Sequence, residues 1–400
     1  MRWVLMKSPL DGLVILDMTR FLSGPFCTML LGDMGAGVIK VEPPEVGDDT
    51  RAWAPFIGGQ GSYYLSTNRN KKSLCVDTRQ AEGNEVLRRM VGNADVFVEN
   101  FKPGLMDRLG LDFKSLIALN PRLIYCSISG FGQSGPYRDR PGYDQILQGM
   151  SGLMSITGTE ESGPVRVGLA IGDIITALFA TYGILSALYA RERTGKGQWV
   201  TTSILEATVG ILTMQAGKYF ATNLPPGPAG NHHPVISPYG VYRTKDKPMN
   251  IAVGTETMWK NFCHVIGSPE MEKDERFQKN NDRVKNRPEL NPLIEKALSR
   301  KTQNEWVDAL NAAGIPCGPI YTIDQVFKDP QVLHQKMLLE VEHPKAGKIP
   351  MTGLPVQLSE NPPEVILPPP LLGEHTGEVL QKFGFSREEV QHLFAEKIVS

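Results

Sequence analysis

Residues 13–42 read LVILDMTRFLSGPFCTMLLGDMGAGVIKVE, and this stretch decides the fold class. The apolar run Leu13–Met18 predicts a short buried strand, and Ser23 is expected to be the N-cap of the helix that follows. Gly35 ends that helix, and Val38–Glu42 predicts a second strand. A strand, a crossover helix and a second strand in this order indicate two parallel strands of an α/β fold.

The same alternation continues over the first half of the chain. Helices are predicted at Gly83–Val91 and Phe113–Leu119, and further strands at Leu74–Val76, Val96–Glu99, Leu123–Ile128 and Trp199–Ser203. Ligands of such sheets bind at the carboxyl ends of the strands. We therefore expect a functional site in the loops after Met18, Glu42 and Glu99.

A change of pattern marks a second, smaller domain. The segment Asn223–Gly230 is rich in proline and glycine and predicts a linker. Beyond it the sequence predicts a hairpin and three helices, at Tyr239–Arg243 with Asn250–Val253, and at Glu256–Ile266, Glu289–Arg300 and Gln303–Ala313. Near the end, Ser386 and Glu389 have the spacing of a capping box at the start of a last helix.

Composition excludes several classes of protein. Apolar residues make up 41% of the 400 residues, charged residues make up 21%, and the net charge is −1. This balance excludes a mostly disordered chain and a general attraction to nucleic acid or to an anionic membrane. The five cysteines are scattered and form no C-x-x-C pair, which argues against a disulfide framework or a zinc site.

One apolar stretch is long enough to need an interpretation. Ile174–Ala190 contains no charged residue, but it is shorter than the roughly 20 residues that a membrane span needs. We interpret it as a buried core helix and expect a soluble, cytoplasmic protein.

The histidines limit the mechanisms that the chain can use. All seven lie at or after His232, so the large N-terminal part has no histidine base. A Ser-His-Asp arrangement within that part is therefore excluded. His232 and His233 are adjacent, so they cannot share a helix face as metal ligands.

Two motifs admit a phosphate-binding interpretation. Leu31–Gly37 is glycine-rich but ends a helix where a dinucleotide motif would open one, so a helix C-terminus is favoured. Asn68–Lys72 is a basic run before a predicted strand, and it is either a solvated face or a polyphosphate site.

Asp173 is the strongest single candidate for chemistry. It follows small and apolar residues and precedes the apolar helix. One interpretation is a carboxylate at a helix N-terminus, where the helix dipole favours it. The other is a partly desolvated carboxylate nucleophile.

The ordered set of short motifs along the chain resembles the family III CoA-transferases. The resemblance covers nearly the whole chain, and it rests on Leu16–Arg20, Gly24-Pro25, Gly35–Glu42, Gly47–Thr50, Asn68–Lys72, Val98–Phe101, Pro103-Gly104, Ser129–Pro136, Gly172-Asp173, Arg193–Gln198 and Pro369–Thr376. Each motif alone is weak, but their order is specific. Within the family the chain looks most like the succinyl-CoA:dicarboxylate transferases of the glutarate type.

The resemblance implies a fold and an assembly. A large Rossmann-like domain would be built from both chain ends, with residues 1–222 as its first part and 326–400 as a return segment. Residues 223–325 would form the linker and the small middle domain. Members of the family form homodimers of two interlinked rings.

The resemblance also implies an activity, with Asp173 as the catalytic residue. The enzyme would move CoA between two carboxylic acids through an aspartyl anhydride and an aspartyl-CoA thioester. Its partners would be an acyl-CoA, a free carboxylic acid and a second copy of the chain, with no nucleic acid and no membrane. Coenzyme A would be a substrate, and neither a metal nor a tightly bound cofactor is implied.

The family's CoA contacts carry over to eight positions. They are Arg20, Leu22, Val76, Arg79, Asn100, Phe101 and Arg108, together with Asp144 as a carboxylate close to the catalytic one. Two positions depart from the family's pattern: Pro43 stands where a basic residue is frequent, and the glycine loop of the small domain is reduced to Gly254.

Two alternative functions remain open, and so does the choice of the residue that would bind the acyl group. An α-methylacyl-CoA racemase looks similar, but its Gly-His-Asp motif is Gly142-Tyr143-Asp144 here. A CoA-binding protein without catalysis is the other alternative. A dicarboxylate substrate would need a cation for its distal end, and the candidates are Arg20, Arg51, Arg166 and His232.

Overall fold

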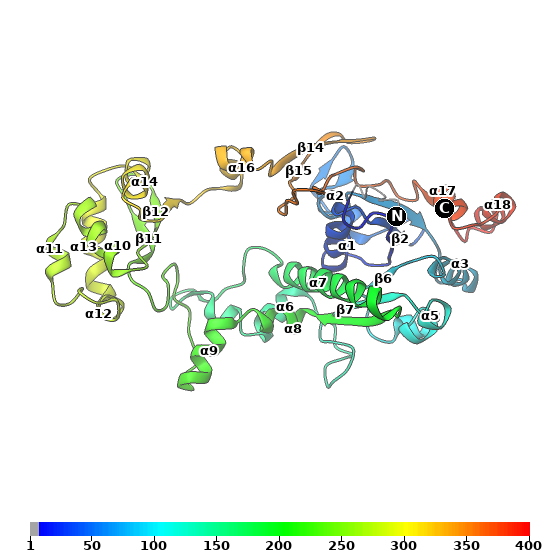
Figure 1. The fold of residues 1–400 in the computed structure, drawn as a ribbon, viewed down its shortest axis with the longest axis horizontal. Helices are drawn as coiled ribbons and strands as arrows, with labels where there is room; N and C mark the ends of the chain where they lie inside the picture. The colour runs from blue at the N-terminus through cyan, green and yellow to red at the C-terminus, as the bar shows by residue number, and fades with distance from the viewer. Residues whose placement is uncertain (1–7) are drawn as a thin grey trace. The chain divides into compact units, whose positions relative to one another are not determined.

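The computed structural model describes residues 8–400, which divide into two compact units (Figure 1). Unit 1 comprises the chain up to Met154 with Arg166–Asn223 and Gln331–Ser400, and unit 2 comprises Ser155–Val165 and Leu224–Pro330. The sequence did not indicate that 155–165 joins the middle unit. This segment forms a short hairpin, β8 (Gly158–Thr159) with β9 (Gly163–Pro164), and Gly230 N donates to Gly158 O over 2.8 Å.

A six-stranded parallel sheet forms the centre of unit 1, in the order β10-β7-β6-β1-β2-β5. The strands are β1 (Val14–Asp17), β2 (Gly37–Glu42), β5 (Lys71–Cys75), β6 (Val96–Glu99), β7 (Ile124–Ser129) and β10 (Gln198–Ser203). Every strand that an apolar run predicted is present, which confirms the α/β class. β5 begins at Lys71, earlier than expected, because two lysines belong to it.

Helices cover both faces of the sheet. Neighbouring residues of a strand point to opposite faces, so Ile15 belongs to the core beneath one set of helices and Leu16 to the core beneath the other. The first set is α1 (Ser23–Asp33) and α7 (Ile171–Thr194). The second is α3 (Ala81–Val91), α4 (Leu105–Leu109), α5 (Phe113–Leu119), α17 (Thr376–Lys382) and α18 (Arg387–Ala395).

Shorter elements complete unit 1. They are α2 (Ser62–Thr67), α6 (Asp144–Met150), α8 (Ile204–Gly210) and α9 (Thr213–Thr222), the small hairpin β3–β4 (Phe56–Ile57, Gln60–Gly61) and the hairpin β14–β15 (Leu338–His343, Gly347–Thr352). The capping box predicted at the start of α18 is present, with Ser386 as N-cap and Glu389 as its partner.

The two ends of α1 differ from each other in how well the sequence predicted them. At the C-terminus, Ala36 N donates to Leu31 O and Gly35 has φ +98°, which confirms that the glycine-rich motif ends a helix. At the N-terminus the N-cap is Leu22 and no side chain caps the helix. The predicted cap at Ser23 is therefore wrong, because Ser23 is already the first helical residue.

The segment after Gln331 completes the sheet beside β5. Cys75 N donates to Thr376 Oγ1 over 3.1 Å, and Ser73 N donates to His375 Nδ1 over 3.3 Å. Val76 and Val399 then form an antiparallel bridge just beyond the end of β5. The edge of the sheet is thus covered by residues that lie about 300 positions later in the chain.

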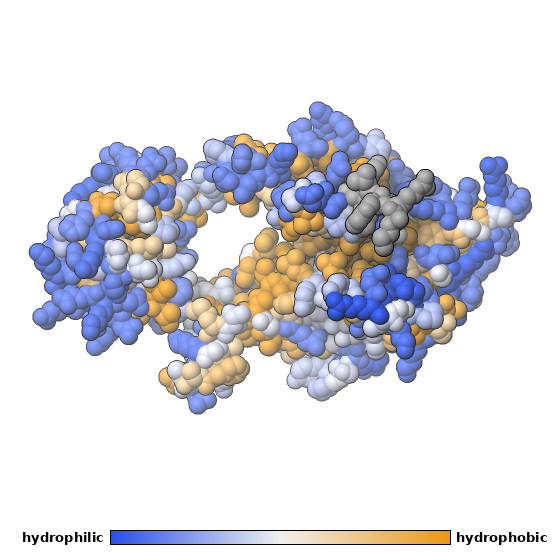
Figure 2. Space-filling model, in the orientation of Figure 1, coloured by the Kyte–Doolittle hydropathy of each residue, from blue (hydrophilic) through white to orange (hydrophobic). Residues whose placement is uncertain are grey.

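Only one face of α7 is buried in unit 1. Four large apolar side chains lie on its outer face, and we call them the α7 stripe: Leu178 (50% exposed), Tyr182 (70%), Leu185 (40%) and Tyr189 (64%). Among residues 8–400, α7 is the one helix long and apolar enough to cross a membrane by length and composition, a test that core helices of soluble proteins also pass. Figure 2 shows apolar surface gathered over this part of unit 1.

Unit 2 has its own core around an antiparallel sheet, β11-β12-β13 (Tyr239–Arg243, Pro248–Ala252, Cys317–Pro319). The predicted hairpin and three helices are all present. The three predicted helices are α10 (Glu256–Val265), α13 (Arg287–Leu298) and α14 (Gln303–Ala312). Three shorter helices also belong to unit 2, α11 (Glu270–Lys273), α12 (Asn280–Lys285) and α15 (Ile323–Val326), and α16 (Pro330–His334) follows where the chain returns to unit 1.

A buried charge cluster lies between α1 and strands β1, β2 and β5. It contains three acids and three bases: Asp17, Glu42, Asp48, Lys40, Arg51 and Lys71. Five of these side chains are at most 1% exposed, and the Arg51 side chain is 12% exposed. The ion pairs join Lys71 to Asp17 (3.0 Å), Lys40 to Asp48 (2.9 Å) and Arg51 to Glu42 (2.8 Å).

The cluster also holds the backbone that leads into α1. Lys40 donates to Thr19 O over 2.9 Å, and Lys71 donates to Pro25 O over 2.8 Å. Asp17 accepts from Thr19 N over 3.0 Å and from the Thr28 hydroxyl over 2.6 Å. Burial raises the pKa of Asp17, but Lys71 and Lys40 outweigh that effect and hold it far below its ordinary value.

Replacing Lys71 by methionine should destabilise the protein by about 3–5 kcal/mol, because the Asp17 carboxylate would stay buried without its partner. The matched control is Lys72→Met on the same strand. Lys72 pairs with Glu378 near the surface, and such a pair contributes about 0–1 kcal/mol. Urea unfolding at pH 7 measures both, and equal losses would contradict the account.

Candidate active site

A cavity of about 290 Å³ opens at the carboxyl ends of β1, β6 and β7. Its lining consists of Phe21, Ser23, Asn100, Phe101, Lys102, Pro103, Ile128, Ser129, Gly130, Phe131, Arg138, Arg140, Pro141, Gly142, Tyr143, Asp173 and Ile204. The loops expected after Met18 and Glu99 both contribute, whereas the loop after Glu42 contributes no lining residue.

Asp173 belongs to the wall of this cavity and to the first turn of α7. Its side chain is half-buried, and the pKa of the carboxyl is raised to about 7. Burial is the largest cause, and the negative charge of Asp144 adds to it. The Ser23 hydroxyl acts in the opposite direction, because it interacts favourably with the ionised carboxylate.

Asp144 is fixed behind Asp173 by hydrogen bonds. Its Oδ1 accepts from Gly172 N over 2.8 Å, and its Oδ2 accepts from Gln148 Nε2 over 2.7 Å. Gln148 Oε1 in turn accepts from Val167 N over 2.9 Å. A Cβ on Gly172 would lie 3.0 Å from Asp144 Oδ1 and 2.8 Å from Ile204, so only glycine lets the two helix starts approach this closely.

Two lining residues of the cavity, Phe21 and Tyr143, belong to a group of four aromatic rings. Phe21 lies 5.7 Å from Trp53 and 6.2 Å from Tyr143 between ring centroids, and Trp53 lies 5.4 Å from Tyr63. Burial and then Asp173 raise the pKa of the Tyr63 hydroxyl, which places this ring in the electrostatic field of the carboxylate. These rings supply low-polarity surroundings for a reacting group.

Four of the expected contact residues lie together. Arg20 N donates to Asn100 Oδ1 (2.9 Å), and Asn100 Nδ2 donates back to Arg20 O (2.8 Å). The Arg20 guanidinium lies 5.4 Å from the centre of the Phe101 ring, and Asn100 and Phe101 both line the cavity. Leu22 is half-buried at the N-cap of α1, next to the lining residues Phe21 and Ser23.

Of the eight expected contact residues, only Asn100 and Phe101 line the cavity themselves. Arg20, Leu22 and Asp144 adjoin or bond residues near its wall, whereas the other three have different surroundings. Val76 is 1% exposed and packs in the hydrophobic core, so its side chain has no free surface for a ligand. Arg79 is exposed beyond β5 and pairs with Asp77 over 2.8 Å. Arg108 is exposed on α4.

Sequence reasoning missed three cations that line the cavity: Lys102, Arg138 and Arg140. Arg138 donates to Gln133 O over 3.1 Å, and Arg140 lies 3.8 Å from the centre of the Tyr137 ring. The available signal was a pair of arginines in a Gly- and Pro-containing loop shortly before Asp144. Together these cations make the cavity suitable for an anionic ligand.

Two candidates for a distal carboxylate do not offer a free positive charge. Arg51 is saturated, since it donates to both oxygens of Glu42, to the Tyr64 hydroxyl and to Pro370 O. His232 belongs to unit 2, where its ring is half-buried beside Tyr242, and burial lowers its pKa and keeps it neutral at pH 7.

The basic run Asn68–Lys72 is neither a solvated face nor a polyphosphate site. Arg69 pairs with Asp33 over 2.7 Å and Lys71 with Asp17, both fully inside the protein, and Lys72 pairs with Glu378. The run was misinterpreted because buried, paired charges look like surface charges in a sequence.

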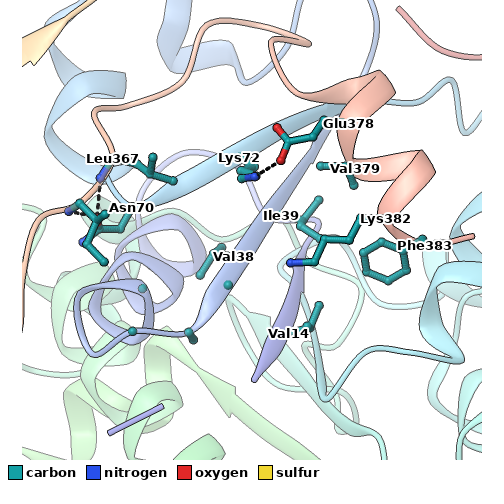
Figure 3. Close-up of a pocket in the computed structure, with 15 residues that line it drawn as sticks. Val14, Val38, Ile39, Asn70, Lys72, Leu367, Glu378, Val379, Lys382 and Phe383 are labelled. Atoms are coloured by element: carbon teal, nitrogen blue, oxygen red, sulfur yellow. Dashed lines mark hydrogen bonds and ion pairs between the residues drawn. The ribbon is translucent and has the colours of Figure 1, made fainter. Parts of the chain in front are cut away.

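A second cavity, of about 260 Å³, lies at the amino ends of β1 and β2 (Figure 3). Its lining is mostly apolar and includes Val14, Val38 and Phe383. The single carboxylate in that lining belongs to Glu378, which is ion-paired with Lys72. This cavity therefore has no unpaired carboxylate, unlike the cavity at Asp173.

The chain is similar to known CoA-transferases. Residues 10–376 match the family model described as CoA-transferase family III. The succinyl-CoA:glutarate CoA-transferase of Mus musculus is 41% identical over 94% of this chain and 86% of its own length. The acetyl-CoA:oxalate CoA-transferase of Acetobacter aceti is 42% identical over 88% of this chain and 90% of its own. A crystal structure of a CAIB/BAIF family protein from Brucella suis matches with a TM-score of 0.85 and 40% identity, over 94% of this chain and all of that one.

The Asp144→Asn variant should lower the pKa of Asp173 from about 7 toward its ordinary value, because the nearby negative charge is removed. The measurement is a titration of ¹³C-carboxyl-labelled aspartate by NMR, with Asp173→Asn used to assign the signal. Asp139→Asn, at an exposed acid beside Arg138, is the control and should leave that pKa unchanged. An unchanged pKa in Asp144→Asn would show that burial alone causes the shift.

Proposed function

Because the chain belongs to CoA-transferase family III, we propose that it moves CoA from an acyl-CoA to a free carboxylic acid with Asp173 as the nucleophile. The observation that carries this proposal is the half-buried Asp173 carboxyl in the wall of a cation-lined cavity. Its raised pKa makes the carboxylate more basic and more nucleophilic than an ordinary aspartate. No histidine is needed, since a carboxylate attacks without giving up a proton.

The proposed reaction proceeds through two covalent intermediates. An Asp173 oxygen attacks the thioester carbonyl of the donor, a C–O bond forms, the C–S bond breaks, and the CoA thiolate leaves. The thiolate then attacks the aspartyl carbonyl of the anhydride, which releases the donor acid as a carboxylate and leaves an aspartyl-CoA thioester. The acceptor acid reverses both steps. One negative charge is conserved throughout, and exclusion of water protects both intermediates.

We assign the cations of the cavity to the CoA phosphates. Lys102, Arg138 and Arg140 lie in the same lining as Asn100 and Phe101, two of the positions implied for contacts with CoA. Arginine donors suit phosphate oxygens because they bind two oxygens at once. Arg79 and Arg108 are both exposed and remain candidates for contacts with the outer part of the nucleotide.

We propose a dicarboxylate as one of the two acids. The relatives named for succinyl-CoA and glutarate support this, and so does a relative of similar identity named for acetyl-CoA and oxalate, because oxalate is also a dicarboxylate. Of the expected partners for a distal carboxylate, Arg20 and Arg166 remain. Both belong to unit 1, and Arg166 precedes Asp173 by seven residues.

We also propose that the enzyme is a cytoplasmic homodimer of interlinked rings. Four large exposed side chains on one helix face support a covering partner, and a second copy of the chain carries the same apolar face. All five cysteines are free thiols, which fits a reducing compartment.

Asp173→Ala should fold normally and lose CoA transfer by several orders of magnitude, since the step that forms the anhydride needs this carboxylate. In the unmodified enzyme, incubation with succinyl-CoA and no acceptor should leave a CoA adduct on the peptide that contains Asp173. Hydroxylamine should convert it to a hydroxamate. Mass spectrometry of the digested protein measures both.

The same experiment in heavy water separates transfer from racemisation. A racemase would exchange the α-proton of a 2-methylacyl-CoA with deuterium and leave Asp173 unmodified. Near-normal transfer by Asp173→Ala, or deuterium in the substrate together with an unmodified Asp173 peptide, would overturn the proposal.

The protein should remain a dimer when it is diluted, because interlinked rings cannot separate without unfolding. Light scattering at micromolar concentration and mass photometry at nanomolar concentration should both give twice the 44.1 kDa mass of the chain. A monomer in either measurement would contradict the interlinked form. Binding of that monomer to lipid vesicles would assign the α7 stripe to a membrane instead.

A further inference from the structure

Ser23 is a buried serine that its helix does not use. It is 4% exposed and is the first residue of α1, where a serine commonly caps the helix. The structure instead has Leu22 at the N-cap and no side-chain cap. A buried hydroxyl needs a hydrogen-bond partner, because leaving it without one costs about 1–3 kcal/mol.

The candidate partner for this hydroxyl is Asp173. Ser23 and Asp173 both line the cavity, and they come from α1 and α7, the two helices packed on the same face of the sheet. Within the described part of the chain, Asp173 is the one ionisable group whose pKa Ser23 is found to influence. The Ser23 hydroxyl thus shares a cavity wall with the carboxyl group that the proposed reaction uses.

We propose that the Ser23 hydroxyl is a catalytic hydrogen-bond donor to the Asp173 carbonyl oxygen in the steps that make and break the aspartyl-CoA thioester. This inference rests on the proposed function of Asp173. In those steps the reacting carbon is that of Asp173 itself, so the oxyanion forms on an oxygen of its own carboxyl group. A donor already positioned there stabilises the charge as it develops.

The atoms and charges of these steps balance. The CoA thiolate attacks the aspartyl carbonyl carbon of the anhydride, and a C–S bond forms while the negative charge moves to the carbonyl oxygen. Ser23 donates to that oxygen and keeps its proton. When the oxyanion collapses, the C–O bond to the donor acid breaks and the acid leaves as a carboxylate. The acceptor step runs in the opposite direction through the same oxyanion.

The buried charge cluster fixes the backbone just before Ser23. Phe21 has φ +68°, which is unusual for a residue with a side chain, and its N–H points to Asp48 Oδ1 at 3.4 Å. Lys40 fixes the preceding carbonyl of Thr19 and is ion-paired with Asp48. The buried charge cluster thus positions the donor, and a pre-positioned donor needs no reorganisation during the reaction.

Other groups around Asp173 do not replace this donor. Asp144 on α6 can only accept when ionised and raises the pKa of Asp173, and Tyr63 on α2 is affected by the negative charges of both aspartates. The cations Lys102, Arg138 and Arg140 line the same cavity, but none of them is among the causes of the Asp173 pKa shift.

The test compares Ser23→Ala with Ser23→Thr, which keeps the hydroxyl, and with Thr181→Val as a matched control. Thr181 is also a hydroxyl residue between α1 and α7, where it bonds Ala177 O and the Cys27 sulfur away from Asp173. For Ser23→Ala we expect kcat to fall about 10- to 100-fold with little change in the KM for succinyl-CoA, because the interaction is made in the transition state. Rapid quenching with mass spectrometry should show slower formation of the CoA adduct on Asp173.

A pH profile supplies a second readout. Ser23 lowers the pKa of Asp173, so its removal should raise that pKa and move the acidic limb of the rate profile to higher pH. Ser23→Thr should recover most of the rate, and the acidic limb of its profile should lie near that of the unmodified enzyme. Thr181→Val should match the unmodified enzyme in both, even if its melting temperature falls.

The outcomes separate this inference from the proposed function. If the unmodified enzyme forms the Asp173 adduct but Ser23→Ala keeps its kcat and its acidic limb, the role of Ser23 is refuted and Asp173 remains the nucleophile. A raised KM with unchanged kcat would also refute it, because it would make Ser23 a substrate-binding residue. If the unmodified enzyme forms no adduct on Asp173, both ideas fall.

Discussion

The candidate active site depends on the buried charge cluster next to α1, in which three acids neutralise three bases. Buried ion pairs contribute little net stability, because desolvation offsets most of the attraction, and an apolar cluster of the same shape could be more stable. Their value here is geometric. Lys40 donates to Thr19 O in the segment that joins β1 to α1, Lys71 donates to Pro25 O in the first turn of α1, and Asp17 accepts from Thr19 N. A charge placed wrongly by even one strand position would leave a partner uncompensated, so the cluster specifies the register of β1, β2 and β5 together with the start of α1.

In the candidate site, burial and charge oppose the effect of the helix dipoles on the two carboxyl groups. Asp173 and Asp144 each belong to the first turn of a helix, where the helix dipole favours a carboxylate by about 0.3–1 kcal/mol. The pKa of Asp173 is about 7, whereas that of an ordinary aspartate is 3.8. This difference corresponds to a free-energy cost of about 4 kcal/mol for ionising the carboxyl group in the folded protein. Burial and the neighbouring negative charge therefore outweigh the dipole. A fold that keeps two carboxyl groups in this arrangement sacrifices stability at a place where a reactive carboxylate is useful.

Apolar runs and glycine positions predicted the sheet, the order of its elements and most helix limits, because each of these depends on local sequence. Asp173 could be singled out from the small residues before it and the apolar helix after it. The rest depended on contacts distant in sequence. Lys71 was expected before the strand and not in it, because a lysine in a buried strand requires an acid that here lies 54 positions away. Arg138 and Arg140 belong to an irregular loop that no periodicity describes, and Val76 is in the core because the end of the chain covers it. Ser23 is a residue type that commonly caps a helix, and only the packing of α1 against α7 places it in the wall of the cavity instead.

The way the sheet is completed has a consequence for biosynthesis. The edge beside β5 is covered by residues that follow it by about 300 positions, including His375 and Val399. At ordinary translation rates of 5–20 residues per second, roughly 15–60 seconds separate the synthesis of β5 from that of its cover. During this interval the nascent chain carries an unprotected strand edge, which is a template for pairing with other chains. Unit 2 is complete in sequence before that cover emerges, so it can fold on the ribosome while the larger unit waits for its last residues.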